Sequence, residues 1–322
     1  MSEEIRQGGV VALPTETVYG LAADALNVRA IRQIFEIKKR PFYDPLIVHV
    51  TCLEKLLELV ELDTKLLSTV STLVEAFSPG PLTYVLPKKS WIPDLVTSGQ
   101  TTVAVRIPQH PLFQEVMLRS RCFIAAPSAN PFGYISPTSA SHVLQSLDGQ
   151  LRHILDGGDC PIGVESTIID LSQSKLCLLR PGKITREEIQ PLLPDQEIED
   201  YVAIAYDGPT KLPAPGLPQQ HYSPKTPLYL FSKKSELPLA MAENVARVFL
   251  SKRDPADGGP DDFFLSEDGN LEVVARQLFA LLRTLDHSHR YEKIYCQCPL
   301  PEGLGMAIAD RLRRAAYLKD IP

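Results

Sequence analysis

The sequence has no long apolar run and no excess of basic residues. None of its apolar stretches approaches the ~20 residues that a membrane-spanning helix requires, so we expect no membrane partner. The first nine residues, MSEEIRQGG, do not resemble a secretory signal peptide, which favours a cytoplasmic location. The formal net charge of -6 and the pI of about 5.7 exclude a chain that coats nucleic acid as a whole. A local basic groove remains compatible with them.

Recognisable metal-binding and nucleophilic motifs are also lacking. The six cysteines are scattered, and the closest pair, Cys296 and Cys298, has a C-x-C spacing that is not typical of zinc sites. We therefore expect reduced thiols that hold no metal. No persuasive Ser-His-Asp or Cys-His set stands out, so we assign neither a covalent nucleophile nor a general base. The chain has no internal repeat, and its 322 residues are most simply two domains.

The most informative stretch lies between residues 10 and 50. Val10–Leu13 is a short apolar run that predicts a buried strand. From Val28 to Lys39 apolar residues recur at helical spacing, and Pro41 prevents the helix from continuing. The run LIVHV then predicts a second strand that is buried on both faces and has His49 as its only polar residue.

The polar residues of this stretch each have two interpretations. The cations that end the helix, Lys38, Lys39 and Arg40, either complement the helix dipole or bind a polyanion. His49 is either a hydrogen-bonded core residue or part of a ligand pocket. Thr17, in the motif PTETVYG, is either an ordinary turn residue or a ligand contact.

Arg106 interrupts an otherwise apolar strand, TTVAVRIP. A buried arginine costs several kcal/mol unless an anion meets it. No acidic residue lies within the strand, and the nearest in sequence, Glu115, falls in the following segment, a helix predicted near residues 111–119. The partner of Arg106 is therefore either a distant carboxylate of the chain or the carboxylate of a ligand.

Hydroxyl-rich residues follow the predicted strand FIAAPSAN in the segment PSANPFGYISPTSAS. Ligands of open α/β sheets usually bind at such strand ends, where backbone N–H groups and Ser oxygens suit a phosphate or a metal-bridged phosphate. A plain loop whose serine caps the next helix is the alternative. Two further strands, in VESTIIDLS and LCLLRPG, contain Ser166 and Arg180, and Thr185 with Glu188 predicts a capping box.

The remaining segments suggest a linker and a second unit. Residues 53–77 are leucine-rich at helical spacing and predict two helices. Six prolines between Pro209 and Pro227 indicate an ordered, extended linker. A smaller α/β unit should follow, with these elements: strand LYLF, helices near Ala240–Lys252 and Leu271–Leu285, strand KIYCQC and a last helix in MAIADRLRRAAY.

These motifs together resemble a known family. PTETVYGL, K-x-R-P, DPLIVH, PGPLT, TVAVR-P, APSAN, ISPT, GVESTI and LLRPG occur in order between Gly8 and Pro194 and resemble the YrdC-type domain of threonylcarbamoyl-AMP synthases. APGLPQQHYSP resembles the linker motif of their long, two-domain form. The resemblance implies an α/β fold with a twisted open mixed sheet of the YrdC type and a deep basic cavity in residues 1–194. A Pro-rich linker at 195–226 and a small Rossmann-like domain at 227–322 would follow.

The resemblance also implies an activity. Such an enzyme makes threonylcarbamoyl-AMP and pyrophosphate from ATP, L-threonine and bicarbonate or CO2, with Mg²⁺ bridged through the ATP phosphates. A downstream tRNA threonylcarbamoyltransferase then modifies the adenosine beside the anticodon, and weak RNA binding is possible. One alternative is an RNA-binding module without ATP turnover. Another is a carbamoyl transferase of the hydrogenase-maturation type, which the absence of zinc-finger cysteines and of an acylphosphatase-like segment disfavours.

Site residues can be carried over from the matching motifs. The residues implied to hold phosphates and metal, and hence to be catalytic, are Lys38, Arg40, Ser128 and Asn130. Those also implied on the ATP side are Asp44, Thr102, Ser136 and Arg180. Those implied in the threonine pocket are Thr17, His49, Arg106, Ala126 and Ser166.

Three positions depart from the family pattern. Asp44 stands where Asn is usual and places a carboxylate near phosphates, so any contact with ATP would run through metal or water. Lys39 replaces a small or neutral residue and adds a cation. Gln219 replaces an aromatic residue of the linker motif and cannot pack as a ring would. If the linker closes over the cavity, its packing over the cavity should differ from that of other family members.

Overall fold

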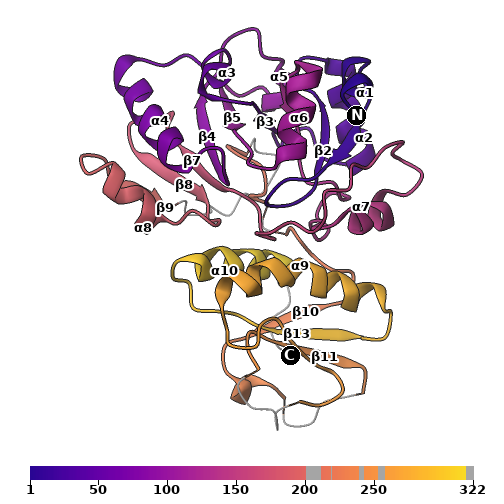
Figure 1. Ribbon diagram of the computed structural model, residues 1–322. Coiled ribbons are helices and arrows are strands. Elements are labelled where there is room, and N and C mark those ends of the chain that lie inside the picture. The colour runs from indigo at the N-terminus through magenta and orange to yellow at the C-terminus, as the bar shows by residue number, and fades with distance from the viewer. Residues whose placement is uncertain (201–211, 219, 239–242, 253–257, 317–322) are drawn as a thin grey trace.

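The computed structural model describes residues 1–200, 212–218, 220–238, 243–252 and 258–316. They form two α/β units, a larger one built on a nine-stranded sheet and a smaller one built on a four-stranded sheet (Figure 1). Two helices of the small unit, α9 (Leu271–His287) and α10 (Leu304–Ala315), lie between its sheet and the larger unit (Figure 1). None of the described helices is long and apolar enough to cross a bilayer.

The large sheet is mixed, as predicted. Its strands, in spatial order, are β1 (Val11–Leu13), β2 (Gly20–Asp24), β6 (Ile124–Ala125), β3 (Ile47–His49), β5 (Thr102–Arg106), β4 (Leu82–Pro87), β7 (Thr167–Asp170), β8 (Leu176–Arg180) and β9 (Ile198–Asp200). Neighbouring strands pair in parallel at β3–β5, β4–β7 and β8–β9 and antiparallel elsewhere. In this register His49 is paired with Arg106, which brings two predicted site residues together.

The helices of the large unit begin and end where the local sequence favours it. They are α1 (Ser2–Arg6), α2 (Val28–Lys38), α3 (Leu53–Leu57), α4 (Thr64–Phe77), α5 (Asp94–Thr97), α6 (Pro111–Ser120), α7 (Ala140–Leu147), α8 (Arg186–Ile189) and the 3₁₀ turn Gln190–Leu192. The Asn27 side chain caps α2, and Lys39 ends the helix in the left-handed conformation with φ 52°. The capping box of Thr185 and Glu188 is confirmed.

The small sheet is entirely parallel. Its strands, in spatial order, are β10 (Leu228–Phe231), β13 (Lys293–Gln297), β11 (Val245–Phe249) and β12 (Asp262–Phe264), and a 3₁₀ turn spans Lys234–Glu236. The predicted Rossmann-like parallel arrangement agrees with this topology. The helix predicted near Ala240–Lys252 is wrong, because residues 245–249 form a strand. Buried parallel strands show no alternation, and a short apolar run such as VARVF does not distinguish strand from helix.

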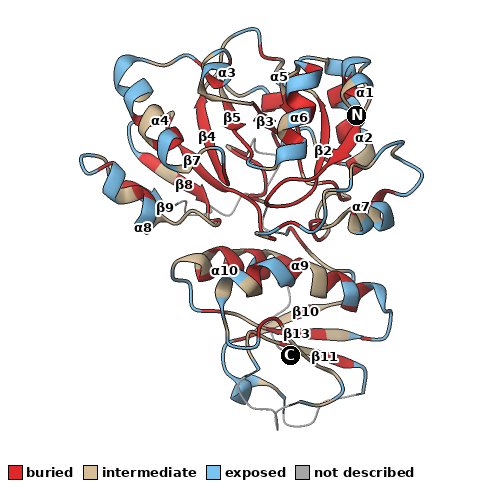
Figure 2. Cartoon of the chain, viewed as in Figure 1, coloured by how far each residue is buried: buried red, intermediate tan, exposed pale blue. Residues whose placement is uncertain are grey.

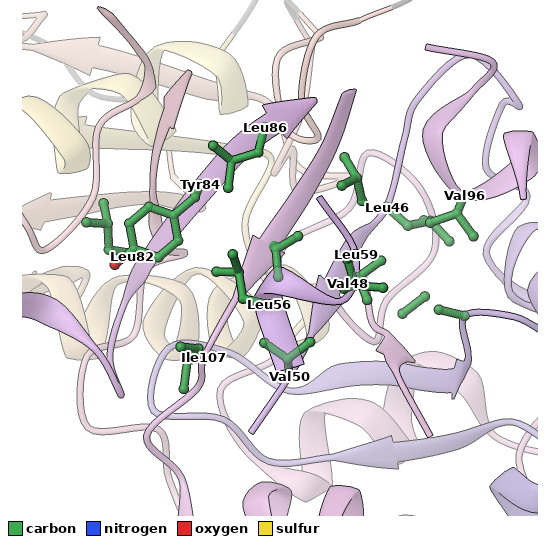
Figure 3. Packing of buried hydrophobic residues seen from close by; sticks show 14 of the residues in the cluster. Leu46, Val48, Val50, Leu56, Leu59, Leu82, Tyr84, Leu86, Val96 and Ile107 are labelled. Atoms are coloured by element: carbon green, nitrogen blue, oxygen red, sulfur yellow. The ribbon is translucent and has the colours of Figure 1, made fainter. Parts of the chain in front are cut away.

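The two faces of the large sheet pack against different parts of the chain. On one face the strands pack against the helices in a continuous apolar core that includes Leu46, Val48 and Tyr84 (Figure 3). Figure 2 shows that the strands are mostly buried, whereas the outer surfaces of the helices are exposed. The other face carries the alternate residues of the same strands, such as Ile47 and Val85, and is covered by the linker: the residues that pack there are Leu212, Ala214 and Leu217.

Two strands of the large sheet were not predicted. β2 begins at the last residue of PTETVYG and continues into residues to which we assigned no element, and β9 lies within the segment predicted as linker, so the sheet extends to Asp200. Of the predicted linker, the structure describes residues 195–200, 212–218 and 220–226, and residues 212–218 and 220–226 form bends and turns without helix or strand. Gln219 lies outside the described residues.

Candidate active site

A small cavity lies between the linker and the sheet of the large unit. Its volume is about 50 Å³, which leaves room for only a few water molecules. The predicted site residues that line it are Thr17, Arg40, His49, Arg106, Ala126, Ser128, Ser166 and Arg180. They come from separate strands, from the chain after α2 and from the loop after β6. The fold therefore gathers most of the predicted phosphate and threonine contacts around one space.

Arg40 reaches this cavity from the chain that follows α2. Its Nη2 forms an ion pair with Asp44 Oδ1 at 2.9 Å, while Nε and Nη2 donate to the backbone carbonyls of Asp44 and Pro45 at 3.0 and 2.7 Å. Asp44 is completely buried, and this burial raises the pKa of its carboxyl to about 6 although Arg40 opposes the shift. Asp44 does not line the cavity. In this structure it holds Arg40 in place.

Lys38 lies behind the cavity and is not part of its lining. Its Nζ donates to the backbone carbonyls of Ser128 and Asn130, both at 2.5 Å. Burial, and then the neighbouring Arg40, lower the pKa of Lys38 well below its ordinary value. Lys38 thus connects the end of α2 to the loop after β6, which carries Ser128. Direct phosphate binding by Lys38 stays a prediction.

Arg106 has the first of the two partners that its sequence suggested, a distant carboxylate of the chain. Nη2 pairs with Glu16 Oε1 at 2.6 Å, Nη1 donates to Thr17 Oγ1 at 3.0 Å, and Nε donates to the carbonyl of Gly80 at 3.2 Å. Glu16 is buried, and its Oε2 has no hydrogen-bond partner among the described residues. A distant carboxylate therefore accompanies Arg106, which still lines the cavity and can meet a ligand carboxylate.

Sequence reasoning missed Glu16. It lies ninety positions from Arg106 along the chain, and the distance between them is closed only by the sheet. The sequence did contain a signal for this pair. Glu16 and Arg106 are each a charged residue among apolar or small residues. Glu16 lies in the loop between β1 and β2, and a buried acid and a buried base at the same end of a sheet are candidates for each other.

Ser166 and Arg180 form another part of the cavity lining. Arg180 donates through Nε to the Ser166 carbonyl at 3.0 Å and through Nη2 to its Oγ at 3.1 Å. The Ser166 hydroxyl also contacts Thr83 Oγ1 at 2.8 Å. Nη1 of Arg180 reaches the carbonyl of Pro215 in the linker at 3.2 Å. This arginine therefore connects the predicted ATP side to the segment that covers it.

The linker supplies part of the cavity wall, which we had not assigned residue by residue. Its lining residues are Pro215, Gly216, His221 and Tyr222. Gly216 has φ +77°, and a Cβ there would lie 2.7 Å from both Arg180 Nη1 and the Tyr222 hydroxyl, so glycine is required. Burial, followed by Arg40 and Lys38, lowers the pKa of His221 well below its ordinary value. A neutral imidazole thus packs against the cations.

Four further predicted or departing residues lie outside the lining. Thr102 and Arg106 occupy opposite ends of β5, about 13 Å apart at ~3.3 Å per residue. The side chain of Asn130 donates to the carbonyls of Pro131 and Tyr134, while its Oδ1 has no hydrogen-bond partner among the described residues. Ser136 donates to Glu165, and Lys39 is exposed.

The buried His49 predicts how stability depends on pH. Burial, and secondarily Arg106, lower the pKa of His49 to about 3, so the folded chain keeps a neutral imidazole. An unfolded histidine titrates near 6.5. Stability is therefore complete above that value and falls as the pH drops from 6.5 toward 3, by up to about 1.4 kcal/mol per pH unit for this residue.

We expect His49→Gln to flatten that acid-side slope, measured by urea unfolding at a series of pH values. His142, whose pKa burial lowers only to about 4, is the matched control, and His142→Gln should flatten a narrower range. An unchanged slope in His49→Gln would show that this imidazole is protonated in the folded chain.

Taken together, the fold and the cavity define a class of protein. Three arginines and several hydroxyls around one cavity of a mixed α/β sheet are suited to a small anionic ligand. Known proteins are similar to this chain in sequence and fold. Residues 3–182 match the family described as "Telomere recombination", and residues 184–317 match "Threonylcarbamoyl-AMP synthase, C-terminal domain".

Individual relatives match along nearly the whole chain. The threonylcarbamoyl-AMP synthase of Pyrococcus abyssi is 39% identical over 97% of this chain and 92% of its own length, and that of Bacillus subtilis is 37% identical over 97% and 90%. The crystal structure of P. abyssi Sua5 complexed with L-threonine superimposes with a TM-score of 0.88 at 36% identity, covering 99% of this chain and 94% of that one. The chain belongs to the two-domain threonylcarbamoyl-AMP synthase family.

Proposed function

We propose that this protein is an L-threonylcarbamoyladenylate synthase, a nucleotidyltransferase that makes threonylcarbamoyl-AMP and pyrophosphate from L-threonine, bicarbonate or CO2 and ATP. The observation that carries the proposal is the convergence of Arg40, Arg106 and Arg180 on one cavity in a chain of this family. ATP, L-threonine and bicarbonate are all anionic or carry an anionic group. Paired guanidinium groups suit phosphates and carboxylates better than lysines do, because their planar donors bind two oxygens at once.

Each substrate has a place in this arrangement. Arg106 would pair with the threonine carboxylate, and the hydroxyls of Thr17 and Ser166 beside it would recognise the polar groups of the amino acid. Arg40, Arg180 and Ser128 would hold the triphosphate on the adjoining walls. Ligand pockets usually measure about 300–1,000 Å³. The cavity is far smaller with the linker in this position, so the linker would have to withdraw for ATP to enter.

The proposed reaction needs alignment more than a reactive side chain. The amine of threonine captures CO2, one carbamate oxygen attacks the α-phosphorus in line, and pyrophosphate leaves. Such a transfer depends on holding the nucleophile near the phosphorus and on neutralising the charge that spreads over the phosphoryl oxygens. In this proposal Arg40 and Arg180 perform the second task, and Arg106 with Thr17 performs the first. We assign no general base.

The donor atoms beside the cavity are compatible with Mg²⁺ carried by ATP. Among the described residues no three His, Cys, Asp or Glu side chains are grouped closely enough to hold a metal ion by themselves. Mg²⁺ commonly binds through few protein oxygens, several waters and substrate phosphates. The Ser128 hydroxyl and the unpartnered Oδ1 of Asn130 are oxygens of this kind. Bound Mg²⁺ would neutralise phosphate charge.

For the proposed product we also propose a cytoplasmic location and a downstream partner that uses it. Threonylcarbamoyl-AMP is a reactive mixed anhydride, so we propose that a tRNA threonylcarbamoyltransferase takes it up. An RNA-binding module without ATP turnover is the alternative. Such a module would bind RNA with an affinity that falls steeply as salt rises, and would release no pyrophosphate.

Pyrophosphate release from ATP, bicarbonate and each of several amino acids tests the proposal. We expect the highest kcat/KM with threonine. Valine should be rejected by ~10⁴-fold or more because it leaves hydroxyl-binding groups unpaired, whereas serine lacks one methyl group, worth only ~1–3 kcal/mol or about 10- to 200-fold. Release that does not depend on threonine, or no release at all, would reject the assignment.

A further inference from the structure

The small domain inserts a completely buried arginine into the wall of the candidate active site. Arg311, on α10, has no exposed surface, and its Nε pairs with Glu165 Oε2 at 2.8 Å. Glu165 belongs to the large unit and lines the cavity. The carboxylate of one domain is therefore neutralised by the guanidinium of the other.

Glu165 is tightly connected to predicted ligand contacts. Its Oε1 accepts a hydrogen bond from the Ser136 hydroxyl, and it directly precedes Ser166, whose hydroxyl and carbonyl hold Arg180. A carboxylate here faces a cavity that is suited to anions. Without a compensating cation it would repel phosphates and compete for Arg180.

The remaining contacts of Arg311 are with the linker, the large unit and its own helix. It lies over the ring of Tyr222 in the linker, 5.3 Å from the ring centre, and Nη2 donates to the Pro181 carbonyl at 3.0 Å. Nη1 pairs with Asp310 of its own helix at 2.7 Å. A side chain with three fixed contacts cannot turn away from Glu165 without breaking the interface.

We propose that Arg311 is a positioning residue of the active site, through which the small domain neutralises Glu165 and so permits ATP to bind beside it. The inference rests on the proposed function. In this proposal the small domain contributes to the affinity of the active site for ATP. Arg311 acts through Glu165 and does not touch substrate.

A second buried arginine at the same interface provides a matched control. Arg283, on α9, donates to the backbone carbonyls of Ile135 and Ser136 and to the Ser146 hydroxyl. Its partners in the large unit are neutral, so its loss weakens the interface without leaving a carboxylate uncompensated at the cavity. Arg311→Met and Arg283→Met therefore separate neutralisation of Glu165 from docking of the domains.

The test is a double-mutant cycle in the full-length protein with Arg311→Met, Glu165→Gln and their combination. We expect Arg311→Met to raise the KM for ATP by about 10- to 100-fold, and Glu165→Gln to restore most of that loss because it removes the unpaired charge. Arg311→Lys, which keeps a charge, should restore part of it. Glu165→Gln should not rescue Arg283→Met.

Two outcomes would overturn the inference. One is an Arg311→Met defect of the same size with and without Glu165→Gln, since Arg311 would then not act through that carboxylate. The other is a lower melting temperature with an unchanged KM for ATP, as expected of a merely structural contact. Equilibrium binding of ATP to the same variants gives this comparison without turnover, so a wild-type protein that releases no pyrophosphate would reject the proposed function and still test the role of Arg311.

Discussion

Replacing Arg40 by alanine is expected to lower threonine-dependent pyrophosphate release by at least about 10²- to 10³-fold. Removal of one preorganised donor to a developing anion typically has this effect, and Arg40 offers a guanidinium fixed by its contacts with Asp44 and Pro45. The measurement is kcat with saturating ATP and threonine. Arg119→Ala, which removes an exposed arginine paired only with Glu115, is the control and should retain normal rates.

The same substitution should also destabilise the protein, and a second change separates the two effects. Arg40→Ala leaves Asp44 buried without its partner, which costs about 3–5 kcal/mol. Adding Asp44→Asn removes the buried charge and should recover most of the unfolding free energy while turnover stays low. Recovery of activity along with stability would mean that Arg40 acts only on the fold.

Replacing Arg106 by glutamine is expected to raise the KM for threonine more than the KM for ATP. Losing one partner of a buried charge-assisted pair costs about 2–5 kcal/mol, or roughly 30- to 5,000-fold in affinity. Thr17 would lose its donor at the same time. Steady-state kinetics with each substrate varied in turn separates the two constants. An equal rise in both would place Arg106 outside the threonine pocket.

Glu16 provides the control for this variant. Arg106→Gln leaves the Glu16 carboxylate buried without a cation, so part of the loss could come from that orphaned charge. Combining Arg106→Gln with Glu16→Gln removes both charges. The double variant should regain melting temperature and keep its high KM for threonine, because no guanidinium remains to bind the carboxylate.

The family resemblance of the ordered motifs implied the large mixed sheet and the cavity, whereas local patterns predicted individual strands and helices. Apolar runs placed His49 and Arg106 in core strands, and the ordered motifs connected them to Ser166 and Arg180; that the two strands are neighbours appears only in the structure. The helix cap of Thr185 was predicted from the side chain that makes it. Each of these features depends on residues that are close in sequence or on a motif of fixed spacing.

Features that depend on tertiary pairing could not be predicted in this way. Glu16 and Arg311 are both far in sequence from their partners, Arg106 and Glu165, and no local pattern pairs them. Lys38 ends α2 as predicted, yet its ammonium group binds backbone carbonyls because the loop after β6 lies there. β11 has helical spacing in sequence and becomes a strand only because two neighbouring strands pair with it.

A crystal structure with L-threonine, bicarbonate and a non-hydrolysable ATP analogue tests the central claim most directly. The account predicts the threonine carboxylate on the guanidinium of Arg106 and the triphosphate on Arg40 and Arg180, with the carbamate site and the α-phosphorus side by side. Triphosphate density on another surface, with Arg40 and Arg180 unaltered around an empty cavity, would contradict it.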